Sequence, residues 1–320
     1  MAKINSVLGS IDTADLGFTL MHEHFMVVNP AMRLAFPDWI NRETIIANTV
    51  KELKIAKDNG VQTVVEVTPI NLGRDIHLIR EVAEKADIQT IVSTGFYYTE
   101  DPFFSYWSTD KLVEKLLPEI YQGIQGTEIK AGIIKCATGE LGVTQTNKKL
   151  LEVASRLHLA TGLPITTHTE PSRRNGLNQL DVFEAENVDL SKVVIGHCDD
   201  AFDLNYLEEL MNRGCYIGFD RFGMREILPS DDERIDCLLR LLEMGYENKI
   251  VVSHDCSNHN DFAPIEEFHE AKTRILPDWR FYHFPRDVIP ILREKGVKDK
   301  QIQVMTIENP RKIFENRRPS

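Results

Sequence analysis

Two histidines separated by one residue stand near the beginning of the chain, at the end of an apolar stretch. Residues 18–25 predict a short strand, and side chains two apart on a strand point to the same face. His22 and His24 are therefore expected to project into one space, with Glu23 on the other face. Two imidazoles aimed together make half of a metal site. A lone His-x-His pair is also typical of packed core histidines, so the rest of the chain must decide.

Polar side chains also interrupt or end four later apolar segments. These residues are Lys135, His168, His197 and Asp255. A charged lysine in an apolar strand is costly to bury without a partner. If the strands are parallel and close into a barrel, their carboxyl ends meet at one rim, and all six polar residues come together there.

The remaining sequence supports such a barrel, because short apolar segments alternate with helical patterns along the whole chain. Strands are predicted at residues 18–25, 63–68, 90–94, 131–137, 164–169, 193–197, 215–219 and 250–255. Helices are predicted at residues 41–59, 74–85, 111–121, 148–161, 179–186, 204–213, 232–244, 286–295 and 300–314. Strands apolar on both faces are typical of parallel sheets, so residues 1–320 predict one α/β domain, a (β/α)₈ TIM barrel.

Two longer segments look irregular and follow strands at the rim, residues 98–109 and 256–285. Loops at this end of a barrel build the active site, so both are interpreted as pocket walls. Residues 316–320 are expected to be a frayed tail.

Composition narrows the class of partner and the compartment. The 320 residues carry a net charge of -12, which argues against nucleic acid, since a phosphate backbone needs a basic face. No signal peptide is visible, and no apolar run approaches the roughly 20 residues that span a bilayer. The 5 cysteines form no Cys-x-x-Cys pair, as is typical of reduced thiols. A soluble cytoplasmic protein without a membrane partner is expected.

The ordered set His-x-His, Lys, His, His, Asp resembles the binuclear-metal amidohydrolase superfamily, and within it the phosphotriesterase-like lactonases. The matching stretches are residues 16–24, 131–135, 168, 195–197, 218–223, 253–255 and 308–310. The resemblance implies two divalent metal ions, bridged by a Lys135 that CO₂ has carboxylated. It also implies His22, His24 and Asp255 on the buried ion, and His168 and His197 on the more exposed one. These ligand types favour zinc, with iron, cobalt or manganese as alternatives.

The same resemblance implies roles for three further groups. Tyr97 matches a tyrosine that positions substrate beside the metals, although a half-buried aromatic residue at a strand end is an equally good interpretation. Arg221 matches an arginine that supports the pocket, and it could equally pair with Asp220 or with a loop carboxylate. Asp255 would accept a proton from the attacking hydroxide, whereas His254 should point to the opposite face.

The function implied is a lactonase in which a metal-bridging hydroxide opens lactones with an acyl or alkyl tail, such as the N-acyl homoserine lactones of quorum sensing, with promiscuous hydrolysis of organophosphate triesters. Apolar residues of two loops could line a channel for the tail: Phe222, Met224, Ile227, Leu228, Phe262, Ile265, Phe268, Ile275, Leu276, Trp279, Phe281 and Tyr282. Some of them could instead pack the loops onto the barrel. The resemblance also suggests a homodimer.

Three alternatives remain open. One is a dedicated phosphotriesterase. Another is a lactonase for phosphorylated sugars, which needs a basic pocket from Arg173, Arg174, Lys272 or Arg274. The third is a binding module whose metals are structural, although structural zinc sites are usually closed sets of four ligands.

Overall fold

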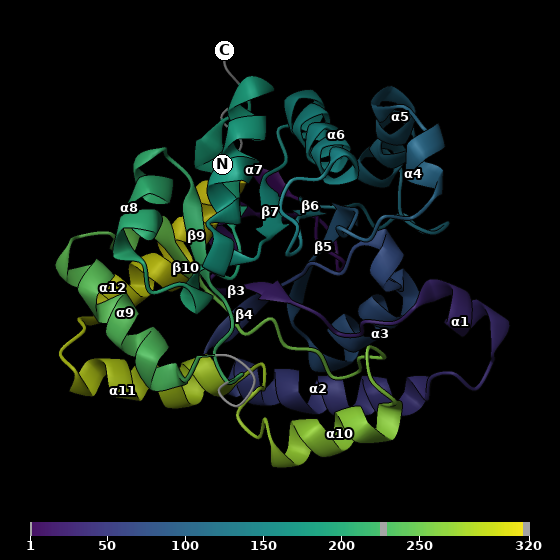
Figure 1. Ribbon diagram of the computed structural model, residues 1–320. Coiled ribbons are helices and arrows are strands. Elements are labelled where there is room, and N and C mark those ends of the chain that lie inside the picture. Colours follow the sequence, from purple (N-terminus) through teal and green to yellow (C-terminus); the bar gives the residue numbers. More distant parts are fainter. Residues whose placement is uncertain (1, 225–228, 316–320) are drawn as a thin grey trace.

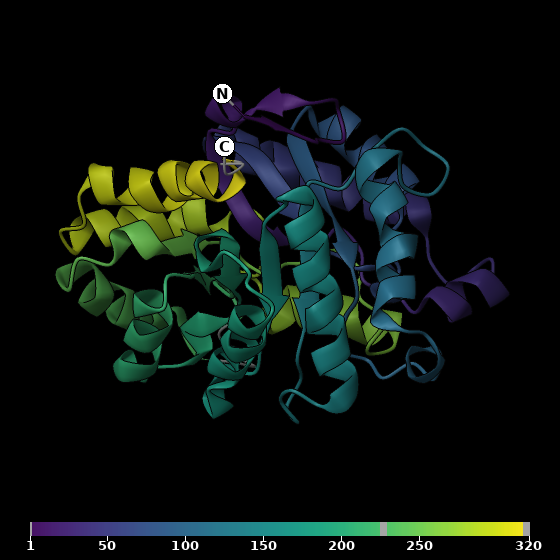
Figure 2. The ribbon, with the colours of Figure 1, turned by 90° about the horizontal axis from the view of Figure 1, so that it is seen from above.

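The computed structural model describes residues 2–224 and 229–315. Eight parallel strands follow one another around a barrel in chain order (Figures 1 and 2). They are β3 (Phe18–Glu23), β4 (Val61–Glu66), β5 (Gln89–Gly95), β6 (Ile133–Ala137), β7 (Ile165–His168), β8 (Val193–Ile195), β9 (Tyr216–Phe219) and β10 (Ile250–Val252). The predicted (β/α)₈ barrel is confirmed, and each strand lies within two residues of its expected start.

The barrel closes between its first and last strands through hydrogen bonds beyond the end of β10. The Asp255 amide donates to the His22 carbonyl at 3.1 Å, and the His24 amide donates to the Cys256 carbonyl at 2.9 Å. The Ser253 hydroxyl accepts from the His22 amide at 2.9 Å. Closure therefore takes place at the two chain segments that carry the predicted metal ligands.

Helices cover the outside of the barrel and pack on its strands (Figure 2). The predicted ones are present as α2 (Arg42–Asp58), α3 (Ile76–Ala86), α5 (Thr109–Tyr121), α6 (Gln145–Thr161), α7 (Asn175–Ala185), α8 (Leu204–Asn212), α9 (Asp231–Glu243), α11 (Ile289–Glu294), α12 (Asp299–Gln303) and α13 (Asn309–Phe314). Most begin where the sequence provides a cap. Asn41, for example, accepts a hydrogen bond from the Thr44 amide. Two π-helical turns, η7 (Phe284–Val288) and η8 (Val304–Glu308), interrupt the last two predicted helices.

Several elements were not predicted. They are a small antiparallel pair, β1 (Lys3–Ile4) with β2 (Ile11–Asp12), and three helices, α1 (Pro30–Ala35), α4 (Phe103–Tyr106) and α10 (Ile265–Arg274). Helices α4 and α10 lie inside the two segments expected to be irregular. Helix α10 buries only one of its residues, Lys272.

Short 3₁₀ turns connect the larger elements. They are η1 (Thr13–Asp15), η2 (Ile70–Leu72), η3 (Pro171–Arg173), η4 (Leu190–Lys192), η5 (Cys198–Asp200) and η6 (Glu247–Lys249).

All 5 cysteines are buried free thiols. In residues 2–224 and 229–315, no helix combines the length and apolar character needed to cross a bilayer. The expected frayed tail, residues 316–320, lies outside the described residues.

Candidate metal centre and active site

The six predicted metal ligands lie at one rim of the barrel, at the carboxyl ends of their strands. They are His22 in β3, His24 just after it, Lys135 in β6, His168 at the end of β7, His197 after β8 and Asp255 after β10. Four of them are buried, and His168 and Asp255 are half-buried. Closure of the barrel brings all six to this rim.

One group of possible ligands joins the two ends of the barrel. Ligand atoms of His22, His24 and Asp255 lie within 4.8 Å of one another. The Asp255 Oδ1 is 3.1 Å from His24 Nε2 and 3.6 Å from His22 Nε2. Both imidazoles thus face the same carboxylate oxygen, as the alternation along the strand predicts.

The other two histidines face each other on the opposite side of Asp255. His197 Nε2 is 2.8 Å from His168 Nδ1 and 3.8 Å from Asp255 Oδ2. His197 has φ 61° and Asp255 has φ 50°, a left-handed conformation that is unfavourable for residues other than glycine. Such strain is typical of functional sites, where the surrounding structure fixes an otherwise rare backbone conformation.

Lys135 lies among these ligands and is 1% exposed. Its Nζ is 2.8 Å from His22 Nε2. Burial lowers the pKa of its ammonium group to about 8, against the opposing charge of Asp255. Among the described residues, no carboxylate reaches ion-pair distance of this nitrogen. Lys135 therefore forms no salt bridge with Asp255.

The protonation states suit metal ligation. Burial, followed by the Lys135 charge, lowers the pKa of His22 to about 3. Burial and the neighbouring His197 also hold the pKa of His168 well below its usual value. Burial alone would raise the pKa of Asp255, but His197 and the hydrogen bond from His24 hold it well below the usual range. At neutral pH the imidazoles of His22 and His168 therefore keep free lone pairs, and the Asp255 carboxylate stays ionised.

Asp220 is part of this centre, and the sequence interpretation treated it only as a partner for Arg221. Its Oδ1 accepts from the His197 amide and lies 2.8 Å from His197 Nδ1, and its Oδ2 lies 3.3 Å from His22 Nδ1. Burial opposes its ionisation, but His197 and His22 lower its pKa below the usual value. A Cβ on Gly218 would stand 2.2 Å from Asp220 Oδ2, so this glycine leaves the carboxylate its space. The sequence did contain a signal for this role, because Asp220 is a carboxylate that directly follows β9 at the same rim.

Arg221 does not pair with Asp220. Its Nη1 donates to Asp200 at 2.5 Å, and its Nε donates to Asp255 Oδ2 at 3.2 Å. The fully buried Arg234 extends the same network, donating to Asp199 at 2.9 Å and to Asp200 at 2.6 Å. Asp255 is therefore held from outside the centre by a chain of buried ion pairs. The pairing of Arg221 with a loop carboxylate was one of the two predicted alternatives.

Tyr97 stands at the open side of the centre. Its hydroxyl is 3.4 Å from His168 Nε2, and its backbone amide donates to Asn71 at 2.7 Å. Burial and the neighbouring Tyr98 and Asp255 raise the pKa of its phenol well above the usual value. The phenol stays protonated and can donate a hydrogen bond.

The opposite face of the same strands is held by Glu23. One of its carboxylate oxygens accepts from the Ser253 hydroxyl at 2.8 Å, the His254 amide at 3.0 Å and His254 Nδ1 at 2.6 Å. The other oxygen accepts from the Cys256 amide at 2.9 Å. Both Glu23 and His254 point away from the centre, as expected from the alternation along the strands.

Four of the residues predicted to line an apolar channel pack the loops onto the barrel instead, which was the stated alternative for some of them. Phe222, Leu276, Trp279 and Phe281 are buried in the core, and the Trp279 indole donates to the His254 carbonyl at 2.9 Å. Phe262 and Ile275 are instead exposed, by 69% and 49%. Ile227 and Leu228 lie outside the described residues. Apolar sequence identified buried segments but not the direction of each side chain.

The donor set fits divalent metal ions. Histidine nitrogens and carboxylate oxygens are the ligands of zinc and related metals, and two overlapping groups form here, His22 with His24 and Asp255, and His22 with His197 and Asp220. His22 Nδ1 and Asp220 Oδ2 are buried without a well-formed hydrogen bond. These two atoms lie 3.3 Å from each other, which leaves the other His22 nitrogen, Nε2, facing Asp255.

A (β/α)₈ barrel with this rim is a metal-dependent hydrolase. Residues 2–314 match the model of the phosphotriesterase family, and the chain belongs to that family, whose members are binuclear-metal hydrolases acting on small-molecule esters or phosphotriesters. A "Phosphotriesterase homology protein" of Mycobacterium tuberculosis is 40% identical over 98% of both chains. An "Aryldialkylphosphatase" of Saccharolobus solfataricus is 36% identical, covering 95% of this chain and 97% of its own. The solved structure of the phosphotriesterase from M. tuberculosis superposes with a TM-score of 0.91 at 39% identity, covering 98% of this chain and 99% of the other.

Proposed function

We propose that the chain holds two divalent metal ions and opens lactones that carry an acyl or alkyl tail, with slower hydrolysis of organophosphate triesters. The observation that carries this proposal is the meeting of four imidazoles, Asp255 and the buried Lys135 at one rim. The proposed ligands are His22, His24, Lys135, His168, His197 and Asp255. Zinc is the favoured ion, with iron, cobalt or manganese as alternatives.

When bound, the two ions supply a Lewis acid for the electrophilic oxygen and lower the pKa of water to near neutrality. Lys135 would help to hold the ions once its side chain has been converted to a carbamate. Its buried amine, with a pKa of about 8, is far more often neutral at pH 7 than an ordinary lysine. The neutral nitrogen forms a bond to the carbon of CO₂ and releases a proton, which leaves a negatively charged oxygen pair where an ammonium would repel cations.

Asp255 is proposed to accept the proton that the attacking water loses. It is ionised, its Oδ1 faces His24, and its Oδ2 is held by Arg221 Nε at 3.2 Å. Arg221 therefore acts as a positioning residue. The neutral phenol of Tyr97 is proposed to donate a hydrogen bond to a substrate oxygen beside His168.

The lactone assignment competes with a dedicated phosphotriesterase. The same centre can serve a carbonyl that becomes tetrahedral and a phosphorus that becomes five-coordinate, and the similarity to the Saccharolobus aryldialkylphosphatase favours the second. Exposed Phe262 and Ile275 on the segment after β10 offer apolar surface to a tail, which favours the first.

A lactonase for phosphorylated sugars is disfavoured, because two of its four candidate cations are already paired with carboxylates. Arg174 is paired with Asp203 and Glu209, and Arg274 is paired with Glu270. Lys272 is buried against neutral acceptors.

We also propose that the protein is a homodimer. Sedimentation velocity measures the mass of the particle in solution and so tests this proposal.

The decisive experiment combines metal analysis with a substrate panel. Elemental analysis of active protein is expected to give two metals per chain, and one or none would contradict the proposed centre. The kcat/KM for lactones is expected to rise with tail length and to exceed that for a triester with a phenol leaving group. A higher value for the triester would favour the dedicated phosphotriesterase, and activity only on a phosphorylated lactone would overturn both assignments.

A further inference from the structure

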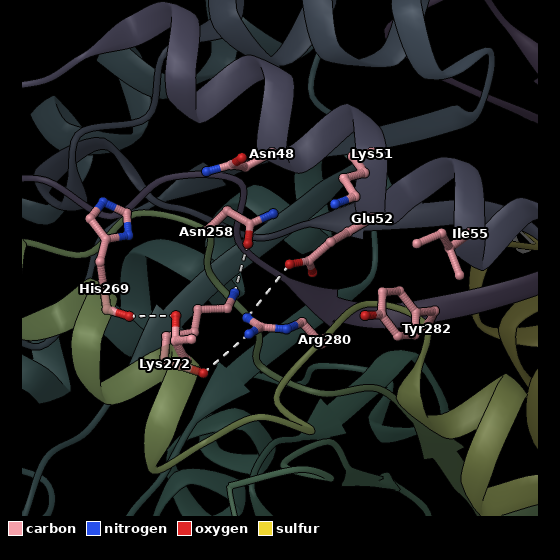
Figure 3. Close-up of a pocket in the computed structure, with 10 residues that line it drawn as sticks. Asn48, Lys51, Glu52, Ile55, Asn258, His269, Lys272, Arg280 and Tyr282 are labelled. Carbon is pink, nitrogen blue, oxygen red and sulfur yellow. Dashed lines mark hydrogen bonds and ion pairs between the residues drawn. The ribbon is translucent and has the colours of Figure 1, made fainter.

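A cavity of about 400 Å³ lies between helix α2 and the segment that follows β10 (Figure 3). Asn48, Lys51 and Glu52 of α2 form one wall, and residues on and around α10 form the other. None of the lining residues belongs to the metal centre. The cavity is within the size range of small-molecule sites, roughly 300–1,000 Å³.

The floor of this cavity contains a buried ammonium group. Lys272 is 4% exposed, and its Nζ donates to the Ser257 carbonyl at 2.5 Å and to Asn258 Oδ1 at 2.7 Å. The nitrogen also stands 3.3 Å from Cys256 Sγ and 5.0 Å from the centre of the Trp279 ring. All of these partners are neutral, and among the described residues no carboxylate lies at ion-pair distance. The hydrogen bonds are satisfied, but the charge is not balanced.

Two more cations line the same cavity. Arg280 Nη1 stands 3.6 Å from Glu52 Oε1, and Arg280 Nη2 donates to the Lys272 carbonyl at 3.1 Å. Glu52 therefore balances Arg280. Lys51 has no hydrogen-bond or ion-pair partner in the described part of the chain, and Figure 3 shows its side chain directed toward Asn258 and Glu52. Lys51 and Lys272 remain as two unbalanced positive charges in one concavity.

This charge is unusual for the molecule as a whole, because the chain carries a net charge of -12. We infer that the cavity is a binding site for a small organic anion, one whose carboxylate or phosphate group lies between Lys51 and Lys272. Amide groups of Asn48 and Asn258 line the same space and can donate to such a group. An oxyanion bound there would balance the buried Lys272, which no protein carboxylate does.

The site is connected to the metal centre through the backbone. Lys272 contacts three consecutive residues, Cys256, Ser257 and Asn258, that directly follow Asp255. An anion bound beside Lys272 would therefore act on this segment through the contacts of that side chain. Trp279 lies against the Lys272 ammonium, so its fluorescence is expected to report binding.

The test is calorimetric titration of the metal-loaded full chain with two probes, inorganic phosphate and succinate, at low ionic strength. The variant Lys51→Glu reverses one of the two unbalanced charges on an exposed side chain. Lys54→Glu is the matched control, because Lys54 is also an exposed lysine of α2 but does not line the cavity. The wild type and the control are expected to bind at least one probe, and the Lys51 variant is expected to bind it at least tenfold more weakly.

The outcomes separate this site from the metal centre. A probe that binds only at the metals gives the same affinity in both variants, and that result overturns the inference, as does a wild type that binds neither probe. Tighter binding of phosphate than succinate identifies a phosphorylated ligand, and the reverse identifies a carboxylate. Lys51 is exposed, so its replacement should not disturb the core. If the variant loses binding but keeps the lactone kcat of the wild type, misfolding is excluded as the cause.

Discussion

The barrel seam is the junction between β3 and the segment that follows β10. Replacing Glu23 by glutamine tests whether one carboxylate holds this seam together. Glu23 is buried and accepts four hydrogen bonds from the segment around His254, three at one oxygen and one at the other. In Glu23→Gln the amide oxygen can keep the three, but the amide nitrogen then faces the Cys256 N–H, donor against donor. One charged hydrogen bond is lost and one buried donor loses its partner.

The expected loss of stability follows from those two changes. A hydrogen bond to a charged group contributes about 1.5–3 kcal/mol, and an unsatisfied buried donor costs about 1–3 kcal/mol, so the free energy of unfolding should fall by about 2.5–6 kcal/mol. With an unfolding entropy of about 2.1 cal/mol/K per residue, a chain of 320 residues should lose roughly 4–9 °C in Tm.

Differential scanning calorimetry at a fixed scan rate measures this shift. Glu243→Gln is the control, because Glu243 is exposed and its replacement should change stability by no more than about 0.5 kcal/mol. If the Tm of Glu23→Gln stays within 1 °C of the control, the seam does not depend on this carboxylate and the reasoning above is wrong.

Four further predictions concern the centre and its support. Asp255→Asn should retain some metal but lose about 10²–10⁴-fold in kcat, more for lactones than for triesters with an acidic phenol leaving group; a loss of only a few-fold with both metals bound would show that another group takes the proton. Lys135→Ala should lose at least one metal and nearly all activity, with partial rescue by a short carboxylic acid, and full activity without rescue would exclude the bridge. Arg234→Met should cost about 3–5 kcal/mol, because it leaves the buried Asp199 without its counter-ion, and urea unfolding within 1 kcal/mol of wild type would refute this. In metal-free protein, His22 has a pKa of about 3 against about 6.5 when unfolded, so the unfolded state binds more protons and stability should fall as pH drops from about 6.5 toward 3; a flat profile in that window would contradict the assignment.

The sequence was sufficient for the barrel because its signals are local and repeated. Each strand is a short apolar run followed by a helix with a recognisable start, and a parallel arrangement brings all the carboxyl ends to one rim. The alternation along β3 also predicted that His22 and His24 share one face while Glu23 takes the other, as the structure shows.

Other features depend on contacts that no local pattern contains. Asp220 was missed as a member of the centre because its neighbour Arg221 provided a simpler partner, and only the fold shows that Arg221 turns to Asp200 and Asp255. Aromatic residues after β10 were expected to line a channel, but Trp279 instead packs inward against the His254 carbonyl. Hydrophobic character predicts burial without saying which space the side chain fills.

The seam of the barrel has a consequence for biosynthesis. Glu23 and Ser253, whose side chains form a hydrogen bond across the seam, are 230 residues apart in sequence. Beside them, the His24 imidazole lies against one carboxylate oxygen of Asp255. A ribosome exposes the two histidines early and Asp255 only when most of the chain has been made. The proposed buried metal site lacks its Asp255 ligand on a nascent fragment, so we expect metal loading to follow completion of the last strand. Truncation before residue 255 should therefore yield chains that neither close the barrel nor retain metal.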